Sequence, residues 1–370
     1  MTQTAGFIGL ISGTSIDAID CALVSFDGAR PTLKATHSRP YSPVLRQQLL
    51  TLCSQTDISL ELLGEAHVAV GQHFAAAVNE LLAREKLQPE QIQAIGSHGQ
   101  TVYHKPEQPL AFTLQIGDPN TIAFNTGIIT VADFRGKDMA AGGEGAPLAP
   151  LFHRAVFASP DTSRVIVNLG GIANLSVITD GREFLGYDTG PANVLMDYWI
   201  DKNLQQPVDL QGQWATSGDV SEDLLTLLLD DPYFAAPEPK STGREYFNGR
   251  WLEERLSRLA QPVPAADVQA TLLELTASTV VTEIDNQLQP DQVFLCGGGA
   301  HNTALVKRFR QLLPDSDVAS TEQLGIPPDW VEAMTFAWLA RERLAGSPQD
   351  TCSITGAARP VILGGVYLAD

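Results

Sequence analysis

Gly9-Leu10-Ile11-Ser12-Gly13-Thr14-Ser15-Ile16-Asp17-Ala18-Ile19-Asp20 is the stretch that decides the fold. It joins two apolar runs, residues 7–11 and 21–26, which are typical of the arms of a β-hairpin. Gly13 lets backbone N–H groups approach an anion closely and tolerates a positive φ, and the hydroxyl side chains add further donors. The carboxylates of Asp17 and Asp20 would repel a bare phosphate, so they suit such a turn only beside a cation such as Mg²⁺. A polar turn without a ligand is the alternative, because Gly, Ser, Thr and Asp all favour turns.

Composition limits the classes of protein to which the chain can belong. Its 370 residues favour two domains, and its 44% hydrophobic and 18% charged residues are typical of a globular protein. The net charge of −19 argues against nucleic acid and anionic membranes as partners. No apolar run approaches the ~18–20 residues that span a bilayer, and the N-terminus lacks a signal-peptide pattern. Four widely spaced cysteines without a CxxC pair favour a reducing, cytoplasmic location.

Short apolar runs alternate with amphipathic helical patterns, which predicts an α/β architecture. Strands are expected at residues 7–11, 21–26, 92–96, 128–132, 164–169, 173–178 and 292–296. Helices are expected at residues 60–84, 191–200, 272–288, 300–313 and 330–344. A glycine-rich zone at 116–150 suits a cleft or hinge between domains. We therefore expect an N-terminal domain over 1–127 and a C-terminal domain over 128–370.

Two later stretches repeat the pattern of an apolar strand followed by glycines. Gly170-Gly171 lies between two strand-like runs, as Gly13 does, so a second hairpin could hold the other side of a polyphosphate. Gly297-Gly298-Gly299 follows an apolar strand and precedes a helix, whose N-terminus favours anions. A tight β–α turn without a ligand is the alternative for this third cluster. Neither a dinucleotide fingerprint nor a P-loop is present.

Three glycine turns in this order resemble those of the actin, sugar-kinase and Hsp70 ATPase superfamily. This resemblance implies a two-domain, actin/sugar-kinase-like fold (a duplicated ribonuclease H-like fold) with an interdomain cleft. It assigns the first two turns to the phosphates of ATP and the third to its adenosine. The cofactor-binding residues so implied are Gly13, Thr14, Ser15, Ile16, Asp17, Ala18, Ile19, Asp20, Gly170, Gly171, Gly297, Gly298 and Gly299.

Further motifs resemble those of the anhydro-N-acetylmuramic acid kinase family over essentially the whole chain. These motifs are GTSIDAID at 13–20, GSHGQT at 96–101, QIGDP at 115–119, ADFR at 132–135, AGGEGAPL at 141–148, YDTGPAN at 187–193 and EAMTFAWL at 332–339. Ala18 and Ala192 stand where the family commonly has glycine. The resemblance implies that water opens the 1,6-anhydro bond of a cell-wall-derived muramic sugar while the γ-phosphoryl group of ATP passes to O6. The products would be N-acetylmuramic acid 6-phosphate and ADP, which places the reaction in peptidoglycan recycling.

Two carboxylates are the candidate catalytic groups, as glycosidic chemistry commonly requires. Asp188 lies in an expected strand-to-helix turn, and the resemblance implies that it is the base that activates water. Capping of the following helix is its alternative role. Glu332, early in an expected helix, is placed by the resemblance beside the attacking water, although a glutamate there also complements the helix dipole.

Polar residues after two of the expected strands are the candidate sugar ligands. They are Ser97, His98, Gln100, Thr101, Asp133 and Arg135. Ligands of α/β sheets bind at the carboxyl ends of strands, and an arginine suits a carboxylate or phosphate. The basic loop 240–244 could also meet an anion, or simply lie in solvent. The histidines show no zinc spacing, so Mg²⁺ is expected only with ATP, near Asp17.

Two other functions share some of these features. An ATP-driven conformational protein of the same fold would hydrolyse ATP without an acceptor. An ATP-independent glycoside hydrolase could use Asp188 and Glu332, but it would leave the three glycine turns unexplained. The resemblance also implies a small-molecule substrate and a homodimer.

Overall fold

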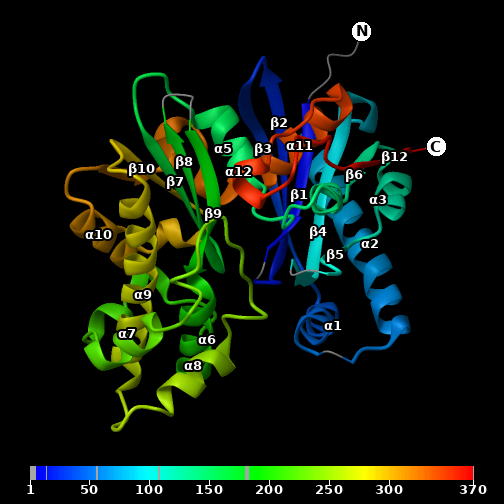
Figure 1. Cartoon of the computed structure of the whole chain (residues 1–370). Coiled ribbons are helices and arrows are strands. Elements are labelled where there is room, and N and C mark those ends of the chain that lie inside the picture. Colours follow the sequence, from blue (N-terminus) through cyan, green and yellow to red (C-terminus); the bar gives the residue numbers. More distant parts are fainter. Residues whose placement is uncertain (1–5, 14, 56, 107–108, 180–182, 370) are drawn as a thin grey trace. The chain divides into compact units, whose positions relative to one another are not determined.

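The computed structural model describes residues 6–13, 15–55, 57–106, 109–179 and 183–369. These residues form two compact units (Figure 1). One comprises Met1–Val156 and Trp330–Asp370, and the other comprises Phe157–Asp329. Among the described residues, no helix combines the length and apolar character needed to cross a bilayer.

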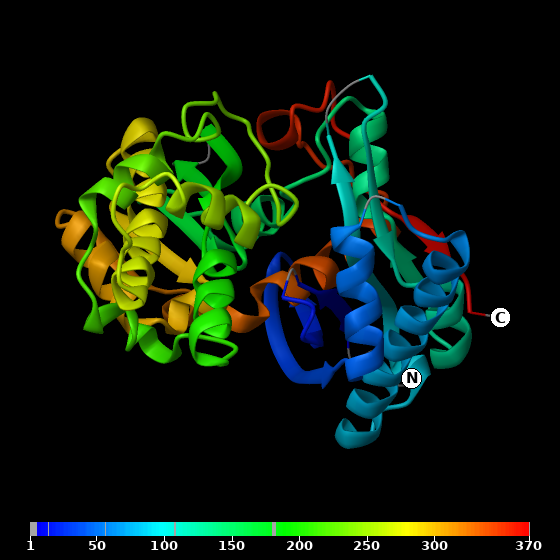
Figure 2. The ribbon, with the colours of Figure 1, turned by 90° about the horizontal axis from the view of Figure 1, so that it is seen from below.

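The first unit contains a seven-stranded mixed sheet in the order β12-β6-β4-β1-β2-β3, with β5 paired to β4. Its strands are β1 (Gly6–Ser12), β2 (Ala18–Asp27), β3 (Arg30–Pro40), β4 (Ile92–Lys105), β5 (Phe112–Ile116), β6 (Thr130–Ala132) and β12 (Gly365–Tyr367). Its helices are α1 (Pro43–Ser54), α2 (Leu60–Glu85), α3 (Pro119–Thr126), α4 (Phe134–Ala140), α5 (Ala149–Phe157), α11 (Val331–Ala345) and α12 (Cys352–Thr355). Figure 2 shows the blue helices α1 and α2 beside the strands of this unit.

The second unit contains a five-stranded sheet in the order β11-β10-β7-β8-β9. Its strands are β7 (Arg164–Leu169), β8 (Ile172–Thr179), β9 (Glu183–Pro191), β10 (Gln292–Cys296) and β11 (Asp317–Ser320). Its helices are α6 (Asn193–Leu204), α7 (Glu222–Leu229), α8 (Gly249–Leu256), α9 (Ala265–Gln287) and α10 (Thr303–Leu312). Short 3₁₀ turns complete it, and one of them, Gly298–His301, separates β10 from α10.

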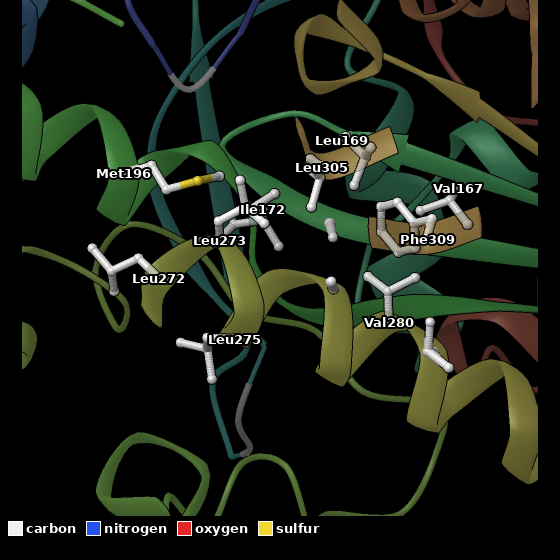
Figure 3. Packing of buried hydrophobic residues seen from close by; sticks show 14 of the residues in the cluster. Val167, Leu169, Ile172, Met196, Leu272, Leu273, Leu275, Val280, Leu305 and Phe309 are labelled. Carbon is white, nitrogen blue, oxygen red and sulfur yellow. The ribbon is translucent and has the colours of Figure 1, made fainter. Parts of the chain in front are cut away.

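The core of the second unit forms where α9 packs on the sheet. Alternate residues of β7, such as Val167 and Leu169, point to the same face as Ile172 of β8. Leu273 and Val280 of α9 belong to the same buried cluster (Figure 3). Because α9 is buried over most of its length, it forms a rigid support behind the sheet.

In the first unit, α11 packs closely on the middle of the sheet through two glycines. A Cβ at Gly9 of β1 would lie 1.8 Å from the carbonyl oxygen of Ala333, and one at Gly96 of β4 would lie 2.0 Å from that of Phe336. Both distances are far below van der Waals contact, so the helix backbone can approach the strands only at glycine. This packing joins the C-terminal part of the chain to its first strand.

The division into units differs from the boundary expected after residue 127. β6 pairs with β4 in parallel, and β12 pairs with β6, so residues on both sides of that boundary share one sheet. The return of α11 to β1 adds residues 330–370 to the first unit. Pairings between strands far apart in the sequence do not change the local composition, so the composition near residue 127 could not reveal the true division into units.

Candidate functional site

The hairpin expected at the start of the chain is confirmed, since β1 and β2 pair in antiparallel register from Phe7↔Val24 to Ile11↔Asp20. In its turn, the N–H of Ile16 donates to the carbonyl oxygen of Gly13 at 3.3 Å. Apart from its chain neighbours, a Cβ at Gly13 would meet no atom of the described residues within 4 Å, so the backbone here is open to a ligand. Thr14 lies outside the described residues.

The left-handed residue of this turn is Ile16 (φ +53°); Gly13, which can tolerate a positive φ, does not adopt one here. A β-branched residue in this conformation costs on the order of 1–3 kcal/mol. Burial of the Ile16 side chain and a 3.0 Å hydrogen bond from Arg46 Nε to its carbonyl oxygen hold the strained backbone. The turn is therefore preorganised by its surroundings.

The other residues assigned to this turn divide into two groups. The exposed Asp17 accepts hydrogen bonds through Oδ1 from Ser15 Oγ at 2.5 Å and from the Ala18 N–H at 2.9 Å. Its carboxylate remains a suitable oxygen ligand for Mg²⁺. Ala18, Ile19 and Asp20 belong to strand β2, and the Ile19 side chain is buried. At these three positions, only the backbone or the Asp20 carboxylate can face a nucleotide, because Ala18 has no polar side chain and that of Ile19 is buried.

The second glycine turn is also confirmed as a hairpin, between β7 and β8. The carbonyl of Gly170 accepts from the Asn193 N–H at 3.0 Å and from its Nδ2 at 2.8 Å, while that of Gly171 accepts from the Ala192 and Val194 N–H groups. A trans peptide directs its N–H opposite to its carbonyl, so the Gly171 N–H points away from α6. This arrangement suits an anion on the outer side of the turn.

The third glycine cluster turns sharply after β10. Gly297 has φ +76°, and a Cβ there would lie 2.4 Å from Asn168 Oδ1. Beyond its chain neighbours, a Cβ at Gly298 would meet none of the residues that the structure describes within 4 Å, so its backbone can lie against a flat ligand. Gly299 faces Leu169 and is required for packing. The helix α10 begins only at Thr303, after the 3₁₀ turn, and Asn302 caps it.

Asp188 lies within strand β9, which corrects the expected strand-to-helix turn. Ala192 precedes the first residue of α6, so the capping role for Asp188 is also wrong. The Asp188 side chain is buried, and its Oδ2 accepts a 3.0 Å hydrogen bond from the Thr242 N–H. Its carbonyl accepts from Tyr233 Oη at 2.7 Å. The carboxylate is therefore held in a defined orientation.

A row of polar residues crosses the sheet toward Asp188. Cys296, Asn168, Asn174 and Asp188 are successive cross-strand partners on β10, β7, β8 and β9. Direct partners share a face of the sheet and lie about 4.5–5.5 Å apart. Asn174 Oδ1 is buried and has no hydrogen-bond partner within the described structure. This amide is placed to bind a water molecule or a hydroxyl group beside the Asp188 carboxylate.

The candidate sugar ligands on β4 lie inside the strand, because β4 continues to Lys105 instead of ending at Gly96. Ser97, His98 and Gln100 are buried and Thr101 is half-buried. Gln100 Oε1 accepts from Ser12 Oγ at 2.5 Å, and its Nε2 donates to the Gly13 carbonyl at 3.4 Å. Gln100 therefore braces the first hairpin turn. Ser97 Oγ is buried without a partner among the described residues.

The buried His98 and the half-buried Arg135 form a polar pair. Arg135 Nε and an Nη donate to His98 Nε2 at 3.1 and 2.9 Å, and His98 Nδ1 lies 3.1 Å from the Gly99 carbonyl. This pattern fits a neutral imidazole with its proton on Nδ1. Burial, followed by the Arg135 charge, holds the pKa of His98 well below its usual value. Arg135 also binds the carbonyl of Gly145.

The first turn of α4 and the loop after it carry the other polar candidates. Asp133 is the exposed N-cap of α4 and accepts from the Gly136 N–H at 3.1 Å. The buried Asp138 accepts from the Gly145 N–H at 2.8 Å and from Thr355 Oγ1 at 2.9 Å. The loop at 141–145 is thereby tied to the C-terminal segment. It is held in place next to Arg135.

Glu332 lies in the first turn of α11 and is half-buried. It belongs to the first unit, as do the first hairpin and the β4 and α4 residues. Asp188 and the second and third glycine clusters belong to the second unit. Within the part of the chain that the structure describes, no three His, Cys, Asp or Glu side chains form a metal-binding group.

Sequence reasoning missed Asn174, Tyr233 and Thr242. The alternation of Asn168 and Asn174 across a predicted hairpin was an available signal. Tyr233 and Thr242 act on Asp188 from an irregular segment, where no periodicity marks them. Ala18 and Ala192, which replace glycines of the family pattern, both have ordinary negative φ angles. Neither position therefore requires the positive φ that favours glycine.

Comparison with known proteins identifies the family. The model of a family described as anhydro-N-acetylmuramic acid kinase matches residues 5–369. The chain belongs to the anhydro-N-acetylmuramic acid kinase family. A curated member from Saccharophagus degradans is 49% identical, over 98% of both chains. Another, from Coxiella burnetii, is 50% identical over 98% of this chain and 97% of its own.

Membership of the anhydro-N-acetylmuramic acid kinase family confirms the resemblance drawn from the motifs. The two units, each with helices around a mixed sheet, confirm the expected two-domain α/β architecture. A solved ROK family glucokinase from Streptomyces griseus, in complex with glucose and AMPPNP, is 15% identical. It matches with a TM-score of 0.42, over 91% of this chain and 99% of its own.

Proposed function

We propose that this chain is an ATP-dependent kinase that opens the anhydro ring of 1,6-anhydro-N-acetylmuramic acid and phosphorylates O6. The full-length match to the anhydro-N-acetylmuramic acid kinase family carries this conclusion. The products are N-acetylmuramic acid 6-phosphate and ADP. The reaction returns a cell-wall sugar to metabolism, which is the role we propose in peptidoglycan recycling.

Asp188 is the proposed general base. Water attacks C1 of the sugar as the C1–O6 bond breaks, and O6 forms its new bond to the γ-phosphorus of ATP, from which ADP leaves. The Asp188 carboxylate takes the proton of the water and later releases it to solvent. A fixed carboxylate performs this task well because little reorganisation is needed at the moment of reaction. We assign Glu332 to the same hydrolytic half of the reaction.

The glycine turns are the proposed nucleotide ligands, and the empty space around Gly13 and Gly298 supports this assignment. Backbone N–H groups at the first two turns would bind phosphate oxygens, and the Ser15 hydroxyl, which here donates to Asp17, would have to turn to join them. Asp17 would contact Mg²⁺, which neutralises charge on the phosphates when bound. Ser97, His98, Gln100, Thr101, Asp133 and Arg135 remain our candidates for the sugar side. Of these, Gln100 and His98 would act mainly by holding neighbouring groups in place.

We propose a homodimer and a cytoplasmic location as well. The cysteines are widely spaced without a CxxC pair, and Cys21 and Cys296 are buried, which suits a reducing compartment. Sedimentation analysis would test the dimer, and cell fractionation would test the location.

An ADP-release assay with 1,6-anhydro-N-acetylmuramic acid tests the function, and Asp188→Asn tests the base. We expect Asp188→Asn to lower kcat by about 10²–10⁴-fold, because it removes general-base catalysis but keeps the shape of the side chain. ATP binding should change little. Wild-type turnover by Asp188→Asn would refute the base assignment. ATP hydrolysis that the sugar does not stimulate would favour a conformational ATPase, and ring opening without ATP would favour a hydrolase.

A further inference from the structure

The segment 238–242, here called the strap, runs beside β9 at the position of Asp188. The Asp188 N–H donates to the carbonyl of Lys240 at 3.0 Å. Two residues further on, the Thr242 N–H donates to Asp188 Oδ2, also at 3.0 Å. The strap thus contacts both the backbone and the carboxylate of Asp188. Its position sets the orientation of that carboxylate.

A buried ion pair anchors the strap. Lys240 Nζ lies 2.7 Å from Glu283 Oε1, and the two side chains are only 6% and 9% exposed. The same ammonium lies 3.3 and 3.4 Å from the carbonyl oxygens of Tyr233 and Phe234. Of the two roles considered for the basic loop 240–244, contact with a bound anion or exposure to solvent, the buried Lys240 has neither here, because it pairs with Glu283. Its charge is used within the protein.

Glu283 connects this anchor to β9 itself. Its second oxygen, Oε2, accepts from Tyr187 Oη at 3.0 Å, and Tyr187 directly precedes Asp188. Burial, together with the Glu283 charge, raises the pKa of Tyr187, so its phenol keeps the proton that it donates. Because α9 is buried on the sheet, Glu283 is a fixed point that holds the strap and the strand together.

We infer that Lys240 and Glu283 are positioning residues for the base Asp188. The ion pair fixes the strap so that the Thr242 N–H holds the Asp188 carboxylate in its working orientation. This inference rests on the proposed role of Asp188. A hydrophobic contact could fill the same volume, but it would lack the directional bonds that set the height of the strap along β9.

A double variant separates positioning from folding. Lys240→Met alone leaves a buried carboxylate without its cation, so we expect this single variant to destabilise the fold strongly. Lys240→Met/Glu283→Gln removes both charges, and the glutamine keeps an acceptor for Tyr187. We expect this double variant to unfold at nearly the wild-type denaturant concentration, with kcat lowered about 10²-fold, as for a misplacement of about 1 Å. The KM for ATP should stay within about twofold, because the glycine turns are unchanged.

Arg308→Met/Glu274→Gln is the matched control. Glu274 also lies on α9, and it forms a bidentate ion pair with Arg308 of α10. Arg308 Nε donates to Glu274 Oε2 at 2.6 Å, and Arg308 Nη2 donates to Glu274 Oε1 at 2.7 Å. Neutralising this pair should change stability by a similar amount but leave kcat at the wild-type value. An equal loss of kcat in the control would show that any damage to α9 lowers activity, and would overturn the inference.

Combining the strap variant Lys240→Met/Glu283→Gln with Asp188→Asn separates the positioning role of the strap from the base assignment of Asp188. If the strap acts through Asp188, the strap variant should cause no further loss in the Asp188→Asn background. Wild-type kcat in the strap variant beside an inactive Asp188→Asn enzyme would overturn the strap alone. Wild-type kcat in Asp188→Asn would overturn the base assignment, and the inference with it.

Discussion

Replacement of Gly13 by alanine should impair ATP binding without harming the fold. Within the described part of the chain, and apart from the neighbours of Gly13 in sequence, the new Cβ would meet no atom within 4 Å, and Gly13 is not in the left-handed region, so the fold has room for alanine. The free energy of unfolding should change by at most about 0.5 kcal/mol, or rise slightly because alanine restricts the unfolded chain. The space that the methyl group fills is the space that we assign to a phosphate oxygen.

The expected loss of affinity follows from one hydrogen bond to a charged oxygen. Such a bond contributes about 1.5–3 kcal/mol, which corresponds to a rise of about 10- to 150-fold in the Kd for ATP. Calorimetric titration with ATP measures this change, and urea unfolding of the same protein without ligand measures stability. Unchanged ATP affinity in Gly13→Ala would refute the placement of the phosphates at the first hairpin.

Two other glycines provide controls with opposite outcomes. Gly96→Ala places a Cβ 2.0 Å from the Phe336 carbonyl oxygen, so it should destabilise the protein by about 3 kcal/mol as α11 is forced from the sheet. Gly64 lies in the exposed part of α2 with nothing within 4 Å of a Cβ, so Gly64→Ala should stabilise the protein by about 0.5–1 kcal/mol. Only Gly13→Ala should separate ATP binding from stability.

Two further predictions concern buried polar groups. Asn174→Ala should lower kcat/KM by about tenfold, because the Asn174 Oδ1 is available to bind the substrate or the attacking water. Stability should change little, because this oxygen has no partner within the described residues. Unchanged steady-state kinetics would show that this amide does not contact the substrate. Burial lowers the pKa of His153 to about 3. The unfolded chain therefore binds a proton more readily near pH 6.5, and the free energy of unfolding should fall by about 2 kcal/mol from this group between pH 6.5 and 5. Urea unfolding at several pH values should show a shallower decline in His153→Gln, and an equal decline would contradict the reasoning.

Much of the local architecture was predictable from the sequence. The bounds expected for β7 and β10 agree with the structure, and both glycine hairpins occur where the apolar runs place them. β3 was missed because its residues alternate between exposed and half-buried positions at the edge of the sheet, with few apolar side chains. The sequence predicts a turn around Asp188 instead of strand β9, because Gly190 and Pro191 at the end of this strand are typical of a turn.

The candidate site was predictable as residue types but not as geometry. Asp188 was singled out, yet its strand environment depends on β8, and its hydrogen bonds come from residues 45 and 54 positions away. Likewise, Ser97, His98 and Gln100 were named as residues beyond a strand, whereas the longer β4 buries them. A strand's length depends on its neighbours, and β5 extends the pairing of β4.

By itself, the sequence determined the alternation of strands and helices, the three glycine turns and the family, because these depend on local composition and on ordered motifs. The tertiary structure decided which groups those motifs meet. Lys240 binds Glu283, and α11 returns to β1 through Gly9 and Gly96. Such contacts join residues far apart in the chain, and packing and burial select them only once the sheets have formed.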